Sequence, residues 1–190
     1  LGATAAVRPL GVECIDLSGF ERVPGRFEPV DEGQDFGVLV DYAHTPDSLE
    51  NVLRAAGELT EGRLHVVFGA GGDRDRGKRP LMGAVAAKPA DRVYVTDDNP
   101  RSEEPSSIRA AIMASCPGGI EIGDRRDANS AAVESLQPGD LLLVAGKGHE
   151  PGQIIGDEVR PFDDVSVARE AVSSIDGGSG SGIAPYGGKD

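Results

Sequence analysis

The sequence lacks tryptophan and contains few aromatic residues and few cysteines. Its 190 residues include 5 Phe, 3 Tyr, no Trp and 2 Cys. Cys14 and Cys116 are far apart and neither belongs to a C-x-x-C pair, which excludes a cysteine zinc site and a disulfide framework. Hydrophobic residues make up 38% of the chain, so we expect one modest globular core built from Val, Ile, Leu and Ala.

Positive charge is also scarce. The chain carries 19 Lys and Arg against 32 Asp and Glu, a formal net charge of −13. This charge repels a phosphate backbone and an anionic bilayer, so we expect no nucleic-acid and no membrane partner. No apolar run approaches the ~18 residues of a membrane span and no signal peptide is visible, which makes the cytoplasm the expected location. Any anion site must therefore come from a local cluster of cations.

The composition changes near both ends of the chain. Residues 1–22 show weak periodicity and begin no βα unit, so we expect the trailing end of a preceding domain. Residues 177–190 start with a Gly/Ser run, which is typical of a flexible linker, here with a tail appended. The domain proper is expected over 23–176.

Between these ends, short β-branched runs alternate with helical patterns. That alternation predicts an α/β fold with a mostly parallel sheet. Thr45 is the expected N-cap of the first helix, with Pro46 at its first position. The strands are expected at 36–41, 64–68, 92–96, 120–122 and 140–145, the helices at 46–59, 80–88, 105–115, 127–136 and 164–175, and a small hairpin at 153–160.

Four polar segments follow four of these strands, at 41–46, 69–80, 97–101 and 146–150. The carboxyl ends of parallel strands meet at one edge of a sheet, where loops and helix N-termini converge on ligands. Turn formation alone does not explain four such loops, so we expect a binding site at this edge.

The second of these loops admits three interpretations. Gly72 to Lys78 has the G-x-x-x-x-G-K spacing of a phosphate-binding P-loop, but Arg79 stands where a Ser or Thr would bind Mg²⁺, and the loop interior is charged. A Gly-rich turn with a salt-bridged rim is the second interpretation. The third is a site for an anionic or zwitterionic ligand, favoured by the clustering of Arg74, Arg76, Lys78 and Arg79 in an acidic chain.

The remaining loops combine acids with a base. Asp98-Asn99-Pro100-Arg101 offers one guanidinium fork and amide groups, and Glu150 offers a carboxylate for an ammonium group. A small zwitterion such as an amino acid needs that mixture, although Asp-Asn-Pro also suits a simple turn. His44 is explained equally well as a turn residue and as a ligand-binding residue. His149 is better explained as a surface residue, or as one that supports the site without touching the ligand, than as a catalytic base.

Four segments together, 41–47, 71–80, 96–105 and 145–150, resemble the C-terminal domain of the Mur ligase family. The resemblance covers about residues 24–175 in collinear order. It implies a Rossmann-like domain, with a mostly parallel open sheet, helices on both faces and a small hairpin edge. It also implies an ATP-dependent amide ligase of peptidoglycan synthesis, of the branch that adds meso-diaminopimelate to UDP-MurNAc-L-Ala-D-Glu.

The resemblance also implies roles for particular residues. The nucleotide side would include Arg26, Asp41 and His44, and neither a catalytic group nor a metal ligand is expected in this chain. ATP and Mg²⁺ would be held mainly by a central domain that the sequence does not contain, so we expect the chain alone to be inactive. The meso-diaminopimelate site would consist of Arg74, Asp98, Asn99, Pro100, Arg101, Gly146 and Glu150.

One alternative belongs to another functional class. The chain could be a non-catalytic module that binds a peptide or a partner, with the tail after Gly182 acting as a tethered ligand within the chain or towards a neighbouring molecule.

Overall fold

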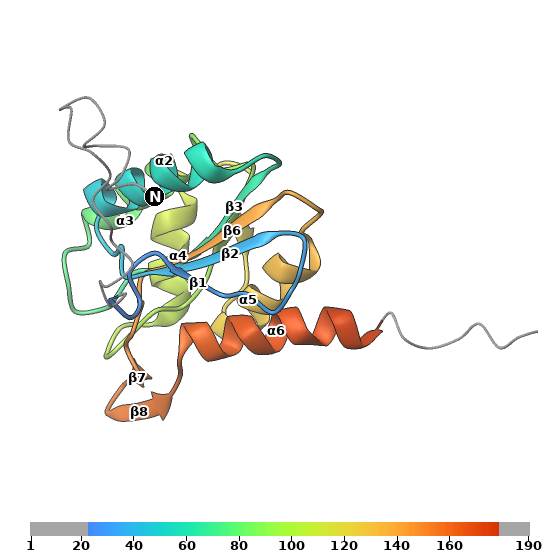
Figure 1. Ribbon diagram of the computed structural model, residues 1–190. Coiled ribbons are helices and arrows are strands. Elements are labelled where there is room, and N and C mark those ends of the chain that lie inside the picture. The colour runs from blue at the N-terminus through green and yellow to red at the C-terminus, as the bar shows by residue number, and fades with distance from the viewer. Residues whose placement is uncertain (1–22, 179–190) are drawn as a thin grey trace, which may run out of the picture.

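The computed structural model describes residues 23–178, with side chains to residue 175 (Figure 1). The expected fragment at 1–22 and most of the expected linker and tail lie outside this range, so the domain boundaries remain predictions. The elements are β1 (Glu28–Pro29), β2 (Gly37–Asp41), α2 (Pro46–Leu59), β3 (Leu64–Phe68), α3 (Lys78–Ala86), β4 (Arg92–Val95), α4 (Pro105–Met113), β5 (Ile120–Glu121), α5 (Arg125–Glu134), β6 (Leu141–Ala145), β7 (Gly152–Ile155), β8 (Glu158–Pro161) and α6 (Asp164–Gly178).

The main sheet has six strands in the order β1-β2-β6-β3-β4-β5. Its five parallel strands are those predicted from the sequence, and the α/β prediction is confirmed. The edge strand β1 is antiparallel to β2, with Pro29 opposite Leu39. The sequence analysis missed β1 because a strand of two residues is too short to show the alternation of apolar and polar residues that predicts a strand.

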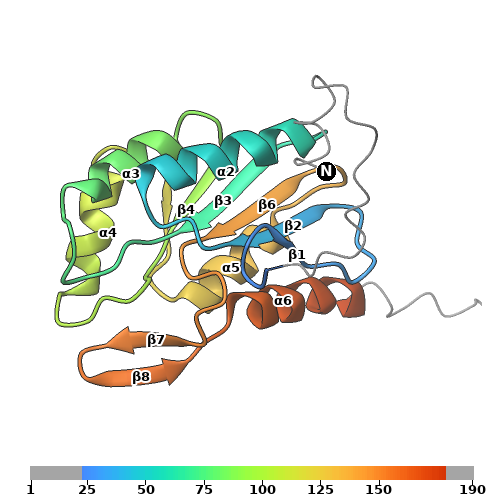
Figure 2. The same cartoon turned by 60° about the vertical axis from the view of Figure 1, so that its left-hand side comes forward.

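The predicted hairpin forms, but it does not extend the main sheet. Strands β7 and β8 make a separate two-stranded sheet that projects beside the domain (Figure 2). Its link to the loop after β4 is a bridge between Arg101 and Ile155. Helix α6 continues to Gly178, two residues into the expected linker.

Helices cover both faces of the sheet, as Figure 2 shows. Helices α2, α3 and α4 lie on one face and α5 and α6 on the other. Alternate residues of each parallel strand face opposite layers. In β6, Leu141 and Leu143 pack with the first layer, while Leu142 and Val144 pack with the second. Burial on both faces explains why these strands are continuously apolar.

The start of α2 shows how the chain turns away from the sheet edge. Thr45 caps the helix by accepting from the Ser48 backbone N–H at 3.2 Å, and Pro46 occupies the first turn, as predicted. The side chain of Ser48 accepts in return from the Thr45 N–H, completing a capping box. The cap fixes where the loop after β2 ends.

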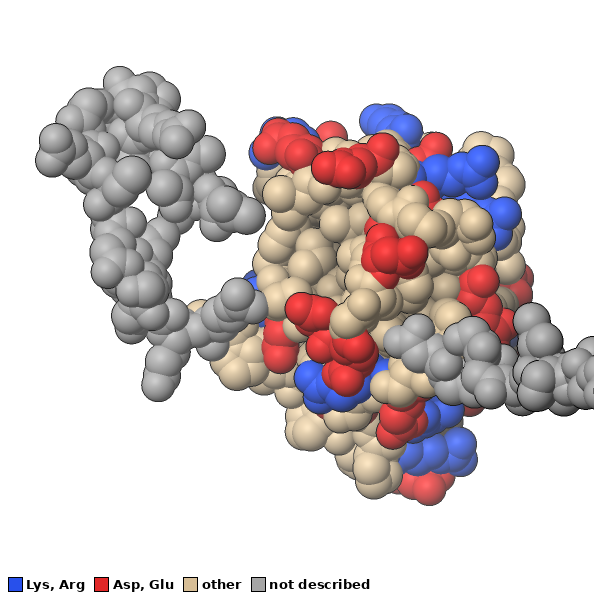
Figure 3. Space-filling model, turned by 45° about the vertical axis from the view of Figure 1, so that its right-hand side comes forward, with Lys and Arg blue, Asp and Glu red and all other residues tan. Residues whose placement is uncertain are grey.

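Acidic and basic side chains are interspersed on the face shown in Figure 3. Between residues 23 and 178, no helix is both long enough and apolar enough to cross a membrane.

A histidine is buried in the sheet. His65 of β3 is 1% exposed, its Nδ1 lies 3.2 Å from Ser135 Oγ, and its Nε2 lies 3.7 Å from Asp140 Oδ2. Burial lowers the pKa of His65, although the neighbouring Asp140 carboxylate opposes this shift. The native state therefore binds a proton at His65 less readily than the unfolded chain does.

This difference predicts a loss of stability in mild acid. Because the unfolded chain protonates His65 first, the free energy of unfolding should fall below pH ~6.5, by at most about 1.4 kcal/mol at pH 5.5. Urea unfolding between pH 7.5 and 5.5 measures this slope. His65→Gln should flatten it, whereas His149→Gln, at an exposed position, should not. Equal slopes in the wild type and His65→Gln would contradict the assignment.

Candidate functional site

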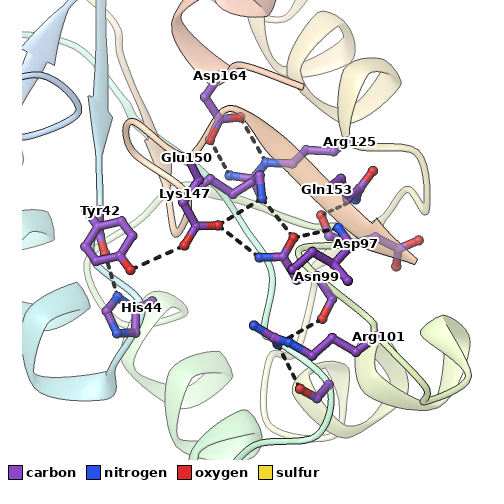
Figure 4. Close-up of polar contacts among 12 residues, drawn as sticks. Tyr42, His44, Asp97, Asn99, Arg101, Arg125, Lys147, Glu150, Gln153 and Asp164 are labelled. Carbon is purple, nitrogen blue, oxygen red and sulfur yellow. Dashed lines mark hydrogen bonds and ion pairs between the residues drawn. The ribbon is translucent and has the colours of Figure 1, made fainter. Parts of the chain in front are cut away.

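A cleft of about 650 Å³ opens at the carboxyl ends of β2, β6, β3 and β4. Strand β6 lies between β2 and β3. The chain leaves β2 and β3 toward the helices on one face of the sheet, but it leaves β6 toward α6 on the other face. The loops therefore diverge at this point and leave a crevice. Figure 4 shows part of its wall. The cleft is lined by Tyr42, His44, Thr45, Pro46, Gly69, Ala70, Gly71, Arg74, Asp75, Lys78, Asp98, Asn99, Arg101, Gly146 and Glu150.

Most of the residues assigned by resemblance meet in this cleft. Of the expected amino-acid site, all but Pro100 line it, and His44 from the expected nucleotide side lines it too. Arg26, Asp41 and Pro100 do not. Their individual roles remain predictions, but their convergence from four loops follows from the strand order.

Asp41 has a structural task. Its Oδ2 accepts from the backbone N–H of Phe27 and its Oδ1 from that of Ala43, each at 2.8 Å. Phe27 has a φ of 48°, a backbone conformation that residues other than glycine rarely adopt, and the hydrogen bond to Asp41 helps to hold it. The neighbouring Arg26 is exposed, and its guanidinium lies 4.9 Å from the centre of the Tyr42 ring, at the rim of the cleft.

The cations of the basic loop after β3 fall into two groups, those paired with Glu103 and those that line the cleft. Arg79 is buried and donates two hydrogen bonds to Glu103, at 2.8 and 3.1 Å, and Arg76 also pairs with Glu103 at 3.1 Å. The hydrogen bonds from Arg79 lower the pKa of Glu103 to about 2. Arg74 and Lys78 line the cleft instead.

This arrangement argues against a P-loop and combines features of the other two interpretations of that loop. Arg79, at the hydroxyl position of a P-loop, is buried against Glu103. A Cβ at Gly72 would lie 1.8 Å from the Pro100 carbonyl oxygen, so this glycine permits two loops to touch. Half of the cluster is thus a salt-bridged rim and half faces the cleft.

Lys78 links two loops across the cleft. Its ammonium donates to the His44 carbonyl oxygen at 2.8 Å. Burial lowers the pKa of Lys78, and the charges of Asp98 and Asp75 oppose this shift. Lys78 therefore brings positive charge to the cleft, near the carboxylates of Asp75 and Asp98.

Asp75, Asp98 and Glu150 supply the negative charge of the cleft, and Asp75 already accepts from the Gly77 N–H at 2.8 Å. Asp98 is 8% exposed and receives no hydrogen bond from residues 23–178. A Cβ at Gly146 would lie 2.9 Å from Asp98 Oδ2, so the glycine leaves room for this carboxylate. Glu150 accepts from the Tyr42 hydroxyl at 3.3 Å and from Asn99 Nδ2 at 2.9 Å. Asp98 lies within reach of the charges of Lys78 and Arg125, but a buried carboxylate that accepts no hydrogen bond from the described residues favours a cationic ligand group.

Arg101 is held by its backbone and by one guanidinium nitrogen. Its φ is 53°, and its N–H and carbonyl bond to Ile154 and Gly156 of the hairpin at 3.0 and 2.7 Å. Its Nη1 donates to the carbonyls of Gly72 and Asn99. No acceptor in the described part of the chain bonds its Nε or Nη2, which leaves donors for a ligand carboxylate.

The sequence analysis did not assign roles to three residues beside the cleft. Tyr42 lines it, and Lys147, buried, bonds to Asn99 and Glu150 (Figure 4). Arg125, also buried, pairs with Asp164 at 2.8 and 2.9 Å and donates to the Ala145 carbonyl. Lys147 lies inside the polar motif at 146–150, which was a usable signal; nothing near Arg125 in the sequence marked it.

The described residues do not form a metal site. Among residues 23–178, no group of three or more His, Cys, Asp or Glu is arranged to hold a metal ion.

Comparison with known proteins identifies the family. Residues 25–148 match the family model described as Mur ligase, glutamate ligase domain. The chain belongs to the Mur ligase family. It is 58% identical over 161 residues to a UDP-N-acetylmuramoyl-L-alanyl-D-glutamate–2,6-diaminopimelate ligase of Caulobacter vibrioides, covering 84% of this chain and 33% of the relative. The corresponding ligase of Brucella melitensis is 52% identical, with 90% and 34% covered.

Solved structures agree with this placement. A structure of a UDP-N-acetylmuramoyl-L-alanyl-D-glutamate–2,6-diaminopimelate ligase superposes with a TM-score of 0.76 at 39% identity, covering 92% of this chain and 37% of that one. A folylpolyglutamate synthase/dihydrofolate synthase of Yersinia pestis shares the fold, with a TM-score of 0.57 at 16% identity and coverage of 92% and 38%. The chain spans about a third of the length of its curated Mur ligase relatives.

The close contact between Gly72, in the loop after β3, and Pro100, in the loop after β4, leads to a testable prediction. Gly72→Ala should lower the free energy of unfolding by about 1–3 kcal/mol, because the new methyl group collides with backbone at Pro100. Gly57→Ala is the matched control: Gly57 lies in α2 and its Cβ would meet nothing closer than 4.0 Å. That control should stabilise by about 0.5–1 kcal/mol. Chemical denaturation of both variants measures the difference, and a neutral Gly72→Ala would refute the contact.

Proposed function

We propose that this chain is the amino-acid-binding, C-terminal domain of an ATP-dependent ligase that adds meso-diaminopimelate to UDP-MurNAc-L-Ala-D-Glu in the cytoplasm. The observation that carries the proposal is the charge arrangement of the cleft. Asp98 and Glu150 line the same cleft as Arg74, Lys78 and Arg101. A cleft with both signs of charge suits a zwitterion better than a simple anion or cation.

The ligand chemistry follows from these groups. One end of meso-diaminopimelate carries an ammonium and a carboxylate, which match the Asp98 and Glu150 carboxylates and the open donors of Arg101. Lysine lacks the distal carboxylate, so Arg101 is the proposed selectivity residue. Arg74 would add a second guanidinium for carboxylate, while Asn99, Pro100 and Gly146 shape the wall.

The proposed contribution to the reaction is positioning. In the complete enzyme, ATP would phosphorylate the D-glutamate γ-carboxylate, and the free amine of diaminopimelate would attack the resulting acyl phosphate and release phosphate. Holding that amine beside its electrophile converts a bimolecular encounter into an oriented one. Arg26 and His44, at the rim, would face the nucleotide side, where Arg26 would stabilise phosphate charge. Asp41 would act there through the turn it holds. Mg²⁺ would be held outside this chain.

Titration of the purified chain tests the binding half of the proposal. Isothermal titration with meso-diaminopimelate should release heat at a 1:1 ratio, and L-lysine should bind at least about tenfold more weakly, because it leaves Arg101 without its carboxylate partner. Asp98→Asn should weaken diaminopimelate binding. Equal affinity for both amino acids would contradict the assigned selectivity.

Arg101→Ala tests selectivity in the complete enzyme. The variant should lose about 2–4 kcal/mol in kcat/KM for diaminopimelate and much less for L-lysine, because truncation leaves the distal carboxylate unpaired. Arg76→Ala, which removes an exposed guanidinium paired with Glu103, is the matched control. Equal losses for both substrates would show that Arg101 supports the loop rather than reading the ligand.

The chain on its own should neither hydrolyse ATP nor form UDP-tripeptide. It lacks an intact P-loop and, in its described part, a metal site. Phosphate release above background together with tripeptide formation by the purified 190-residue chain would overturn this expectation.

A further inference from the structure

A buried lysine next to the cleft is bonded to two cleft residues. Lys147 follows β6, and its side chain is 0% exposed. Its ammonium donates to Asn99 Oδ1 at 3.0 Å and to Glu150 Oε2 at 3.2 Å. A strongly hydrated ammonium group is tolerated in a protein interior only where acceptors replace its water. The placement of Lys147 therefore depends on Asn99 and Glu150, and theirs depends on Lys147.

Lys147 fixes the direction of the Asn99 amide. Asn99 Oδ1 accepts from Lys147 and from the Ile154 backbone N–H at 2.9 Å, while Nδ2 donates to Glu150 Oε2 at 2.9 Å. Turning the amide over would set its NH₂ group against two donors and its oxygen against a carboxylate. Because an ammonium group cannot accept a hydrogen bond, Lys147 permits one orientation only.

Lys147 also fixes Glu150. Glu150 Oε2 accepts from both Asn99 and Lys147, while Oε1 accepts from Tyr42. Burial alone would raise the pKa of Glu150, but the hydrogen bond from Asn99 and the charge of Lys147 hold it below its usual value. Other charged or titratable groups that act on Glu150 are Tyr42 and Arg125, and Asp98 shares the cleft. The result is an ionised carboxylate on the cleft wall.

We propose that Lys147 is a positioning residue for the amino-acid substrate. It does not touch the ligand; its buried ammonium locks the Asn99 amide and the Glu150 carboxylate in the arrangement that receives the ligand's ammonium group. This inference rests on the proposed function, since it takes an amino acid as the occupant of the cleft. Lys147 then sets the KM for that amino acid and leaves acyl transfer itself unchanged.

Lys147→Met in the complete ligase tests the proposal. At pH 8, KM for meso-diaminopimelate should rise about tenfold or more, while kcat and KM for ATP stay within about threefold. Without the neighbouring cation the pKa of Glu150 rises, so the KM defect should deepen toward pH 6 and shrink as the pH is raised. Lys88→Met, which removes an exposed lysine outside the cleft lining, should change none of these values. A defect confined to kcat, or independent of pH, would overturn the proposal.

A double-mutant cycle separates positioning from a general structural role. If Lys147 acts through Glu150, adding Lys147→Met to Glu150→Gln should raise KM by less than about threefold beyond Glu150→Gln alone. Losses that multiply would show that Lys147 does not act through Glu150 and would overturn that half of the proposal. The double variant also removes both charges of the pair, so it should fold even if Lys147→Met leaves an unpaired carboxylate that prevents folding.

Lys147→Gln provides a second route, because it keeps a hydrogen-bond donor and removes the charge. Failure of all three variants to fold would make Lys147 a purely structural residue and overturn the inference. A wild-type ligase that does not use diaminopimelate would overturn the proposed function and this inference with it. A wild type that uses diaminopimelate, with KM unchanged in folded Lys147→Met, would overturn this inference alone.

Discussion

The ion pair between Arg125 and Asp164 is the contact on which the binding edge depends. Both side chains are 0% exposed. Arg125 begins α5, Asp164 begins α6, and the same guanidinium donates to Ala145 at the end of β6. One buried cation thus joins two helices to the strand that leads into the cleft. Removing one partner of such a pair typically costs about 3–5 kcal/mol, because the other charge stays buried alone.

Some charged residues in and around the cleft are paired within the protein, and others are not. Arg79 and Arg76 neutralise Glu103, and Lys147 neutralises Glu150, so these charges stabilise the loops. Asp98 has no such partner in the described range, and Arg101 keeps two nitrogens free of protein acceptors there. These two groups, together with the Glu150 carboxylate that still lines the cleft, are open to a ligand, and they are of both signs.

The sequence predicted the sheet well because its strands are buried on both faces. Continuous apolar runs such as Leu141–Ala145 predict a parallel strand, and Thr45 with Pro46 predicts a helix start. The order of strands, the edge strand at Glu28–Pro29 and the separate hairpin depend on long-range pairing, which a local pattern does not encode. For the site, polar loops at strand ends predicted the location, and most assigned residues do converge. The partners of Arg76, Arg79 and Lys147 could not be predicted, because a charged residue looks the same in the sequence whether it meets a ligand or a neighbouring carboxylate.

The hydrogen bonds between Arg101 and the hairpin have a consequence for local opening. Strands β7 and β8 form a sheet of two strands, and every residue of β8 is exposed. A two-stranded sheet has little stability of its own. The loop that presents Arg101 therefore unfolds and refolds together with a weak element, at a lower free energy than the core. Substitutions along the outer strand will then change how often the guanidinium is correctly placed. If Arg101 selects the substrate as proposed, substrate choice can drift in evolution through residues that do not touch the ligand.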